Sequence, residues 1–436
     1  MSDTHAQTVA YVRDTMLPEQ SPPSTAAGPI KWAVENLFSS VLNTILTLVS
    51  IYFLWAVLAE VLPWVWHGSW TATSLRECRE VIAAAGREHG AACWSVIGER
   101  YLQLFYGFYP SDLYWRVNLA FVLMLVALAP VLFSNLPRKM LWFSALYPFV
   151  AFWLFWGGSI WTPVVILAGF VLGFLALEYL SKMIGSLGGV IAALLVPVIW
   201  WLVLAGPVAT GLHAILPIGI EEVESAKFGG FMLSIIIGVT GIVLSLPIGI
   251  LLALGRQSDL MIVKAICVGF IEFIRGVPLI TLLFVASTLL NYFLPPGTTF
   301  DIVLRVIIMV TLFASAYMAE VVRGGLAALP TGQYEAADAL GLDYWKATRL
   351  ITMPQALKIS IPGIVSTFIG LFKDTTLVSI IGLLDPIGLT NTIRADSNWN
   401  GIVWELYGFI ALMFFIFCFS MSRYSMYLER KLKTGH

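Results

Sequence analysis

Charged residues are scarce in this chain of 436 residues: they make up 12%, whereas hydrophobic residues make up 59%. Soluble domains carry about 25% charged residues, so this composition, with a mean hydropathy of +0.86, indicates an integral membrane protein. The net charge is only -1, and no basic stripe is present, which excludes a nucleic-acid-binding protein. Residues 1–29 are polar and lack an early apolar segment, which excludes a cleavable signal peptide.

Residues typical of catalysis or metal binding are also few. The five histidines are scattered, and none of them forms a metal or catalytic pair. A phosphate-binding Walker motif is missing, so any ATP must bind elsewhere. The sequence therefore predicts no metal site, no cofactor and no enzymatic activity in this chain.

The four cysteines have spacings that fit no metal site. Cys267 and Cys418 lie in apolar runs, and we expect them to be small core residues. Cys78 and Cys93 lie in the first long polar loop, where a disulfide forms only if the loop faces an oxidising compartment. The spacing leaves a disulfide and two free thiols equally open.

Long apolar runs predict an all-α polytopic membrane protein, because about 20 apolar residues in a helix cross a bilayer. The run 140–176 is too long for one helix, and Gly157-Gly158 with Trp161-Thr162-Pro163 predicts a hairpin turn within it. Counting that run twice gives about ten transmembrane helices. The runs are Val41–Ala59, Val117–Pro137, Met140–Ala176, Met183–Pro217, Gly229–Gly255, Gly276–Phe293, Ile302–Val322, Ile359–Leu384 and Gly401–Met421.

Basic residues predict the orientation, because cytoplasmic loops carry an excess of Lys and Arg. If the spans alternate, the basic segments fall on one side, and both termini then lie in the cytoplasm. The loops 67–116, 218–227, 294–300 and 385–400 face the periplasm in this arrangement. The basic segments are Arg138-Lys139, Lys182, Arg256, Lys346 to Lys358 and Arg430 to Lys433.

A polar stretch, GQYEAADALGLDYWKATRLITMPQAL at 332–357, lies between two very apolar runs. Its Glu, Ala, Leu, Lys and Arg residues favour helix, whereas Gly341 interrupts it. The stretch therefore predicts a short helix, a glycine turn and a second helix that closes near Pro354. So much mixed-charge surface between two spans favours contact with a soluble partner.

Ionisable residues inside a span cost at least ~2.5–3.5 kcal/mol each on insertion scales, so each requires a physical reason. Asp374 lies about 22 Å along a helix that starts at Ile359, at 1.5 Å per residue, with Lys373, Thr375 and Thr376 beside it. Its carboxylate either faces a water-filled cavity and binds the ammonium group of a substrate, or pairs with another helix and stabilises the bundle.

Two acid–arginine pairs, Glu272 with Arg275 and Glu320 with Arg323, have the i, i+3 spacing of helix neighbours. We expect both to be ion pairs at the cytoplasmic interface. The alternative for the first pair is that it positions a kinked gating helix, since Gly276 and Pro278 follow it.

The polar stretch resembles the cytoplasmic "EAA" loop of permease subunits of bacterial ABC importers. Three neighbouring segments, FIEFIRGVPL (270–279), SAYMAEVVRGG (315–325) and FKDTTLVSIIGLLD (372–385), are similar to the polar amino-acid permease family over roughly residues 228–430. The apolar first half resembles broad-specificity L-amino-acid importers that have two unlike permeases. The matching loop residues are Glu335, Ala336, Ala337, Gly341, Ile351 and Pro354, with Met353 where leucine is usual.

The resemblance implies a type I ABC importer permease core in the C-terminal half, working by alternating access. It divides the chain into a cytoplasmic tail (1–35), an extension of about five transmembrane helices with a periplasmic loop (36–225), and a core of about five helices (226–436). Within the core, the coupling loop 326–356 would dock into an ATPase homodimer, which binds the ATP. Glu335 would bond the ATPase groove, and Tyr344 and Trp345 would be buried there.

The other partners that the resemblance implies are a paralogous permease, a periplasmic binding protein, membrane lipid and an L-amino acid, all at the bacterial inner membrane. The loop 67–116 would then contact the binding protein or form a packed cap. In this family the helix that carries Asp374 lines the translocation path. The candidate substrate-binding residues are therefore Asp374, Thr375, Thr376, Lys373 and Arg275.

Two other functions stay open from the sequence. An ion-coupled secondary amino-acid transporter predicts matched, inverted halves with broken helices, whereas the two halves here are unlike. A membrane receptor that docks an ATPase without transporting anything leaves Asp374 unexplained. Transport that depends on Asp374 separates these functions.

Overall fold

The computed structural model describes residues 28–86, 90–133, 135–289, 292 and 300–432. Most of the expected tail and most of the expected loop 294–300 therefore lie outside the described residues. The chain divides into two compact units, which are described separately. Unit 1 comprises Met1–Ser69 and Ile82–Ala92, and unit 2 comprises Trp70–Val81 and Cys93–His436.

The part of unit 1 that the structure describes includes α1 (Pro29–Leu37) and α2 (Val41–Trp66). The Ser40 hydroxyl caps α2, because it accepts a hydrogen bond from the Asn43 N–H at 3.2 Å. The Thr47 hydroxyl donates to the Leu37 carbonyl at 2.8 Å, which joins the two helices. α2 is long and apolar enough to cross a membrane.

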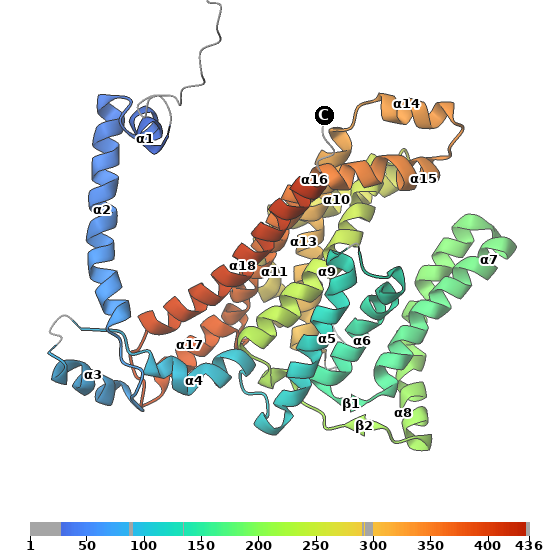
Figure 1. The fold of residues 1–436 in the computed structure, drawn as a ribbon. Helices are drawn as coiled ribbons and strands as arrows, with labels where there is room; N and C mark the ends of the chain where they lie inside the picture. Colours follow the sequence, from blue (N-terminus) through green and yellow to red (C-terminus); the bar gives the residue numbers. More distant parts are fainter. Residues whose placement is uncertain (1–27, 87–89, 134, 290–291, 293–299, 433–436) are drawn as a thin grey trace, which may run out of the picture. The chain divides into compact units, whose positions relative to one another are not determined.

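The first part of unit 2 is a series of helices interrupted by one small sheet (Figure 1). α6 ends at Trp156, and Gly157 and Gly158 both have positive φ, so the predicted hairpin turn is present. Another glycine with positive φ, Gly185, breaks α7 into two spans. The elements are α3 (Leu75–Ala84, which crosses the unit boundary), α4 (Ser95–Tyr106), α5 (Tyr114–Leu132), α6 (Leu141–Trp156), α7 (Trp161–Ile199) and α8 (Ala205–Ile215), with β1 (Gly158–Ser159) antiparallel to β2 (Gly219–Ile220).

The second part of unit 2 has α13 at its centre, packed against α9 and α16, and α18 packs against α16. Turns of π-helix follow α11 (Val285–Leu289) and α15 (Thr348–Thr352), and a 3-10 helix (Thr375–Ile381) follows α16. The helices are α9 (Gly230–Gln257), α10 (Met261–Gly276), α11 (Leu279–Phe284), α13 (Ile302–Ala327), α14 (Gly332–Ala339), α15 (Tyr344–Ala347), α16 (Met353–Asp374), α17 (Pro386–Ala395) and α18 (Trp404–Leu432).

The described residues contain nine helices that are long and apolar enough to cross a membrane, and ten spans if the bent pair α10–α11 counts as one. The predicted all-α fold with about ten spans is therefore confirmed. The predicted span 276–293 was wrong in position, because its helix begins at Met261 and bends by 101° after Gly276. Pro278 explains the bend, since it lacks an N–H and disfavours helix at Val277.

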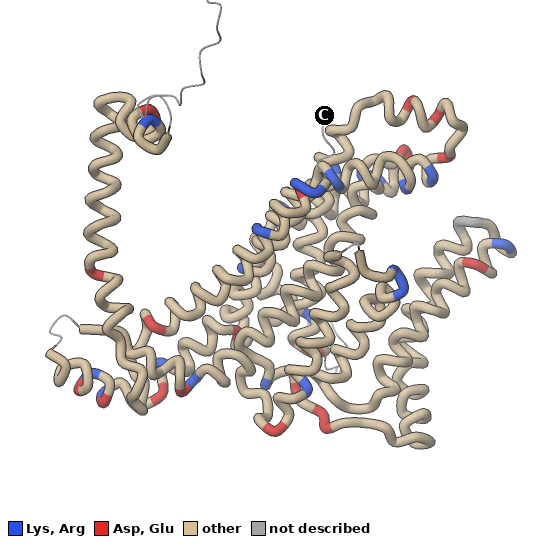
Figure 2. The backbone as a smooth tube through the Cα atoms, in the orientation of Figure 1, with Lys and Arg blue, Asp and Glu red and all other residues tan. Residues whose placement is uncertain are grey.

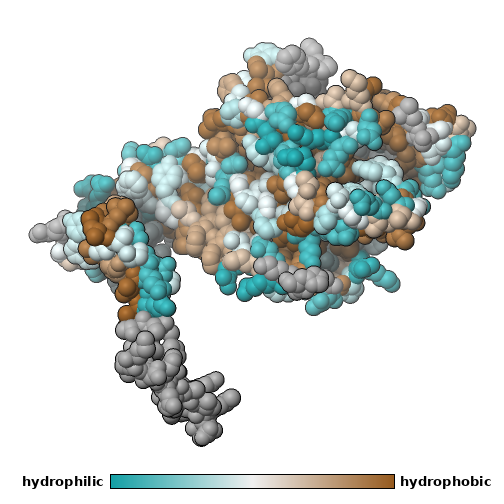
Figure 3. Space-filling view, turned by 90° about the horizontal axis from the view of Figure 1, so that it is seen from above, coloured by the Kyte–Doolittle hydropathy of each residue, from teal (hydrophilic) through white to brown (hydrophobic). Residues whose placement is uncertain are grey.

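Basic residues of unit 2 gather at the end that carries α14, α15 and the last turns of α18 (Figure 2). The opposite end, around α4 and α17, carries both signs of charge. Figure 3 views the molecule from the end that carries α14 and α15, where hydrophilic and hydrophobic side chains are mixed.

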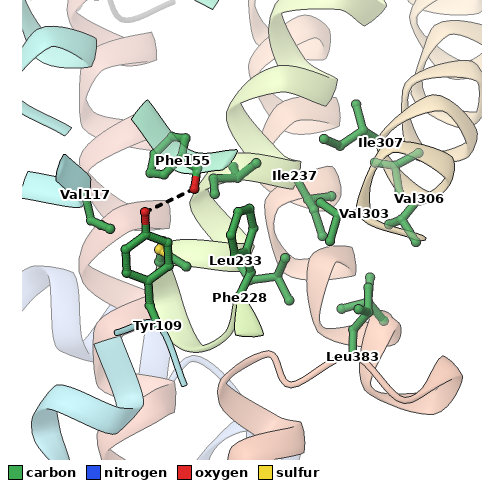
Figure 4. Packing of buried hydrophobic residues seen from close by; sticks show 14 of the residues in the cluster. Tyr109, Val117, Phe155, Phe228, Leu233, Ile237, Val303, Val306, Ile307 and Leu383 are labelled. Atoms are coloured by element: carbon green, nitrogen blue, oxygen red, sulfur yellow. Dashed lines mark hydrogen bonds between the residues drawn. The ribbon is translucent and has the colours of Figure 1, made fainter. Parts of the chain in front are cut away.

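The largest buried cluster joins the hairpin α5–α6 to the beginnings of α9 and α13 (Figure 4). The Tyr109 hydroxyl donates to the Phe155 carbonyl at 3.1 Å. The indole N–H of Trp156 donates to a carboxylate oxygen of Asp301 at 3.0 Å. Asp301 also caps α13, accepting from the Val303 N–H at 2.8 Å. The first half of the chain therefore contacts the start of α13 directly.

Candidate functional site

The polar stretch after α13 forms two short helices, α14 and α15, on either side of Gly341. In α14, Ala337 is 1% exposed, whereas Glu335 and Ala336 are exposed. The side-chain amide of Gln355 in α16 donates to the side-chain oxygen of Gln333 at 2.9 Å. The stretch is therefore a folded loop anchored to α16, with the side chain of Glu335 exposed.

Gly341 ends α14 in a Schellman motif. Its N–H donates to the Asp338 carbonyl at 2.9 Å, and the Leu342 N–H donates to the Ala337 carbonyl at 3.2 Å. The φ angle of Gly341 is +67°, which L side chains rarely adopt. The positive φ at this position therefore explains why the predicted turn contains a glycine.

Exposed apolar side chains lie on both sides of the turn. Tyr344 and Trp345 are 55% and 67% exposed, and Leu340 is 73% exposed. Asp343 caps α15, and its carboxylate lies 2.8 Å from the Lys346 ammonium. The hydrogen bond from the Lys346 side chain holds the pKa of Asp343 below its ordinary value. Aromatic groups on a capped, ordered loop are suited to contact with another macromolecule.

The predicted end of the second helix near Pro354 is wrong. Helical backbone continues from Tyr344 through the π-turn Thr348–Thr352 into α16, and Pro354 occupies the first turn of α16. Proline is tolerated in the first turn of a helix. The π-helical turn Thr348–Thr352 precedes it, and there i→i+5 hydrogen bonds replace the regular i→i+4 bonds that the proline ring would disrupt. Ile351 lies half-buried in the wide turn. The loop is thus continuous with the helix that ends at Asp374.

Asp374 is the last residue of α16 and is half-buried, whereas Lys373 is exposed. The hydroxyl of Thr375 donates to the Phe372 carbonyl at 2.8 Å, and that of Thr376 donates to the Lys373 carbonyl at 2.9 Å. No salt bridge of Asp374 is present among the described residues. Its carboxylate can therefore accept hydrogen bonds from a cationic ligand.

The structure places Arg275 against Glu320 and Tyr317 instead. Its Nη1 lies 3.6 Å from Glu320 Oε2, and its guanidinium carbon lies 5.7 Å from the centre of the Tyr317 ring. The expected pair of Glu320 with Arg323 is present at 2.9 Å. Arg275 thus belongs to an ionic cluster at the ends of α10 and α13.

Arg256, at the end of α9, completes this cluster, whereas the sequence analysis used it only to predict the orientation. Its Nη1 lies 2.8 Å from a Glu320 oxygen and 2.9 Å from a Glu272 oxygen. Glu272 therefore pairs with Arg256, and the expected pair of Glu272 with Arg275 is absent from the described residues. The sequence shows Arg256 as a basic residue after an apolar run. Local spacing cannot identify its partner Glu320, which lies 64 residues away.

A disulfide joins Cys78 to Cys93, and both residues are buried. The Cys93 N–H donates to a carboxylate oxygen of Glu405 at 2.9 Å. Trp399, which is fully buried, donates from its indole N–H to Glu99 at 2.8 Å. This part of the loop 67–116 is therefore cross-linked and packed on the start of α18. The other two cysteines, Cys267 and Cys418, are half-buried free thiols.

Asp385 is a further residue that the sequence analysis missed. It is fully buried at the start of α17, where its carboxylate accepts from the N–H groups of Gly388 at 2.8 Å and Ile387 at 3.2 Å. Burial raises the pKa of Asp385 to about 6, although both N–H groups act in the opposite direction. The dipeptide Asp-Pro is a helix-start signal that could have identified it.

The two regions can do different chemistry. The loop α14–α15 presents a large surface with exposed aromatic side chains, whereas Asp374 presents one carboxylate for a small cationic group. The part of the chain that the structure describes contains no group of three or more His, Cys, Asp or Glu residues that could hold a metal.

Comparison with known proteins gives matches along the whole chain. Residues 245–434 match the family described as binding-protein-dependent transport system inner membrane component. The chain is 59% identical, over 439 residues and 100% of both chains, to the glutamate/glutamine/aspartate/asparagine transport system permease protein BztC of Rhodobacter capsulatus. It is 41% identical, over 408 residues and 93% of both chains, to the inner membrane amino-acid ABC transporter permease protein YhdY of Escherichia coli.

Shorter proteins match part of the chain. The probable glutamine ABC transporter permease protein GlnP of Bacillus subtilis is 32% identical over 211 residues. That alignment covers 48% of this chain and 94% of the shorter protein. About half of the present chain therefore has no counterpart in this relative.

Proposed function

This chain belongs to the family of inner-membrane permease subunits of amino-acid ABC importers, and we propose that it carries acidic amino acids and their amides. It is a multi-pass inner-membrane transport subunit that works with a binding protein and with a separate ATPase, which binds and hydrolyses the ATP. The observation that supports the substrate class is the full-length match to BztC, which is named for glutamate, glutamine, aspartate and asparagine.

We propose that Asp374 binds the ammonium group that these four substrates share. A carboxylate inside a span is costly unless it pairs with a cation, and Asp374 has no salt bridge within the described residues. Recognition through the ammonium group accepts acidic and amide side chains alike, provided that they point away from Asp374. The hydroxyl oxygen of Thr376 can accept from the same ammonium group, whereas Thr375 is fully buried and therefore not available to a ligand. Lys373, which is exposed and adjacent to Asp374 in the sequence, can supply a cation for the substrate carboxylate.

We propose that the loop 326–356 is the contact with the ATPase, through Glu335 and the exposed rings of Tyr344 and Trp345. The ATPase would bind ATP with different affinity in the two states of the permease, which supplies the free energy for alternating access. The family resemblance adds a paralogous permease as the second membrane subunit and an ATPase homodimer. Glu335→Lys is expected to weaken ATPase retention without preventing membrane insertion.

The orientation that we propose places α14, α15 and both termini in the cytoplasm. It is supported by the basic residues at that end of unit 2 (Figure 2), since cytoplasmic segments are rich in Lys and Arg. The division into an extension (36–225) and a permease core (226–436) remains part of this proposal.

The test uses the complete importer in lipid vesicles and measures uptake of the four substrates and of arginine. We expect uptake of the four and little of arginine. Losing one partner of a desolvated charge pair costs about 2–5 kcal/mol, so Asp374→Asn should lower uptake at least about tenfold. Asp112→Asn, at an exposed position, is the control.

Two outcomes would contradict separate parts of the proposal. Uptake of arginine in preference to the four substrates would refute the substrate class. Normal uptake of all four by the Asp374→Asn protein would refute the binding site and leave the substrate class intact.

A further inference from the structure

Five charged side chains meet where the ends of three helices come together. Arg256 ends α9, Glu272 and Arg275 lie on the last turns of α10, and Glu320 and Arg323 lie near the end of α13. Four salt bridges connect them, at 2.8 to 3.6 Å. The mechanism proposed above uses none of these groups.

Glu320 is the centre of this cluster. Its side chain is 16% exposed, the least of the five, and both of its oxygens are paired. One oxygen pairs with Arg256 on α9, and the other pairs with Arg275 on α10 and with Arg323 on its own helix. Without this carboxylate, three guanidinium groups would share only Glu272, and their mutual repulsion would separate the helix ends.

The cluster is directly connected to the loop that we assign to the ATPase. α13 ends at Ala327, about two helical turns beyond Glu320, and α14 begins at Gly332. Between Glu320 and Ala327, α13 packs closely against α16. The Ser360 hydroxyl donates to the Val321 carbonyl at 3.1 Å, and a Cβ at Gly325 would lie 2.0 Å from the Ser360 oxygen. A displacement of the loop must therefore move this end of α13.

The cluster is also connected to the surroundings of Asp374. Arg275 lies in the last turn of α10, directly before the 101° bend into α11. α11 packs against α13 and against the 3-10 helix that follows Asp374. Leu279 and Leu283 of α11 and Val378 of that 3-10 helix are buried in the same apolar cluster.

We propose that Glu320 is a positioning residue that couples the loop to the broken helix α10–α11. Because Glu320 pairs with Arg275, movement of α13 changes the angle between α10 and α11. This change shifts α11, which packs against the 3-10 helix that follows Asp374. Chains of packed side chains and salt bridges carry such coupling between distant sites, typically about 5–150-fold in affinity. This inference rests on the proposed function of the loop, and Glu320 touches neither substrate nor ATP.

The test compares ATP hydrolysis by the complete importer with and without substrate-loaded binding protein, alongside uptake and ATPase retention. Glu320→Gln keeps the shape of the side chain and removes its charge. We expect the stimulation by loaded binding protein to fall to about onefold, and uptake to fall by at least the about fivefold expected for a lost coupling. ATPase retention should stay at the wild-type level, whereas failure of the loop assignment would show as normal ATPase retention in Glu335→Lys.

Two single substitutions separate coupling from general destabilisation. Arg275→Gln breaks the link between α10 and α13 and should reduce the stimulation, whereas Arg323→Gln breaks a pair within α13 and should not. Asp396→Asn, which breaks the pair with Arg100 at 2.7 Å elsewhere in unit 2, is a control for Arg275→Gln, because the two side chains are 31% and 35% exposed. Wild-type stimulation in Glu320→Gln, or equal loss in Arg323→Gln and Arg275→Gln, would overturn the proposal. If Glu320→Gln fails to assemble, the two arginine variants decide.

Discussion

Replacing Gly341 by alanine should weaken the coupling loop by an amount that the structure allows us to work out. The residue has φ of +67°, and a Cβ there would meet no atom within 4 Å. The cost is therefore purely one of backbone conformation, about 1–2 kcal/mol for an L residue in the left-handed region. If the ATPase binds only the native loop and the loop completes its folding on binding, its apparent affinity falls by up to about 5–30-fold.

The matched control for this substitution is Gly341→Asn, because asparagine tolerates the left-handed conformation better than alanine does. The assay is titration of the purified ATPase onto the permease complex in nanodiscs, with uptake measured in parallel. We expect the order glycine, asparagine, alanine in affinity, with membrane insertion unchanged. Equal affinity for all three would refute the view that this Schellman motif shapes the ATPase contact.

Three further predictions concern other parts of the molecule. Replacing Cys78 and Cys93 by serine removes a cross-link between residues 15 apart, so the unfolding free energy should fall by about 3 kcal/mol, measured by thermal unfolding of the purified protein. The pKa of Asp385 is raised to about 6, so its contribution to stability is present below its unfolded pKa and is lost, by about 3 kcal/mol, as the pH rises through 6. Asp385→Asn keeps the helix cap and should remove this dependence, which falls between about pH 4 and 7. A cysteine at exposed Asp338, with Cys267 and Cys418 replaced, should react with a membrane-impermeant maleimide only from the cytoplasmic side.

Each of these predictions has a contrary result. An unchanged unfolding free energy in the variant with serine at both cysteine positions would show that packing alone stabilises the segment around Cys78 and Cys93. A pH dependence that survives in Asp385→Asn would assign it to another group. Reaction of the Asp338 cysteine from the periplasmic side would reverse the proposed orientation.

The sequence predicted the features that depend on local chemistry. Helix-forming residues on either side of Gly341 are sufficient to specify two short helices and a turn, and the structure contains them. Uninterrupted apolar runs likewise predicted the spans, including the division at Gly157. Family membership then decided in favour of an ATP-driven importer over an ion-coupled transporter or a receptor.

The features that the sequence did not predict depend on contacts between distant segments. Lys264, Glu272 and Arg275 make α10 too polar to be recognised as part of a span, although two of these charges are paired with other helices. Pro354 predicted a helix end because a local rule cannot anticipate the wide turn before it. Whether Cys78 and Cys93 are bonded depends on their approach in space, which their spacing leaves open.

The hydrogen bond from Trp156 to Asp301 has a consequence for any attempt to isolate the second half of the protein. A fragment beginning at residue 226 would retain every transmembrane helix of the proposed core, yet its Asp301 would lack the indole donor. Phe228 would also lose the Trp156 ring, whose centre lies 4.8 Å from its own. The fragment would expose an aromatic surface just before the start of α9, so half-length versions of this permease should aggregate.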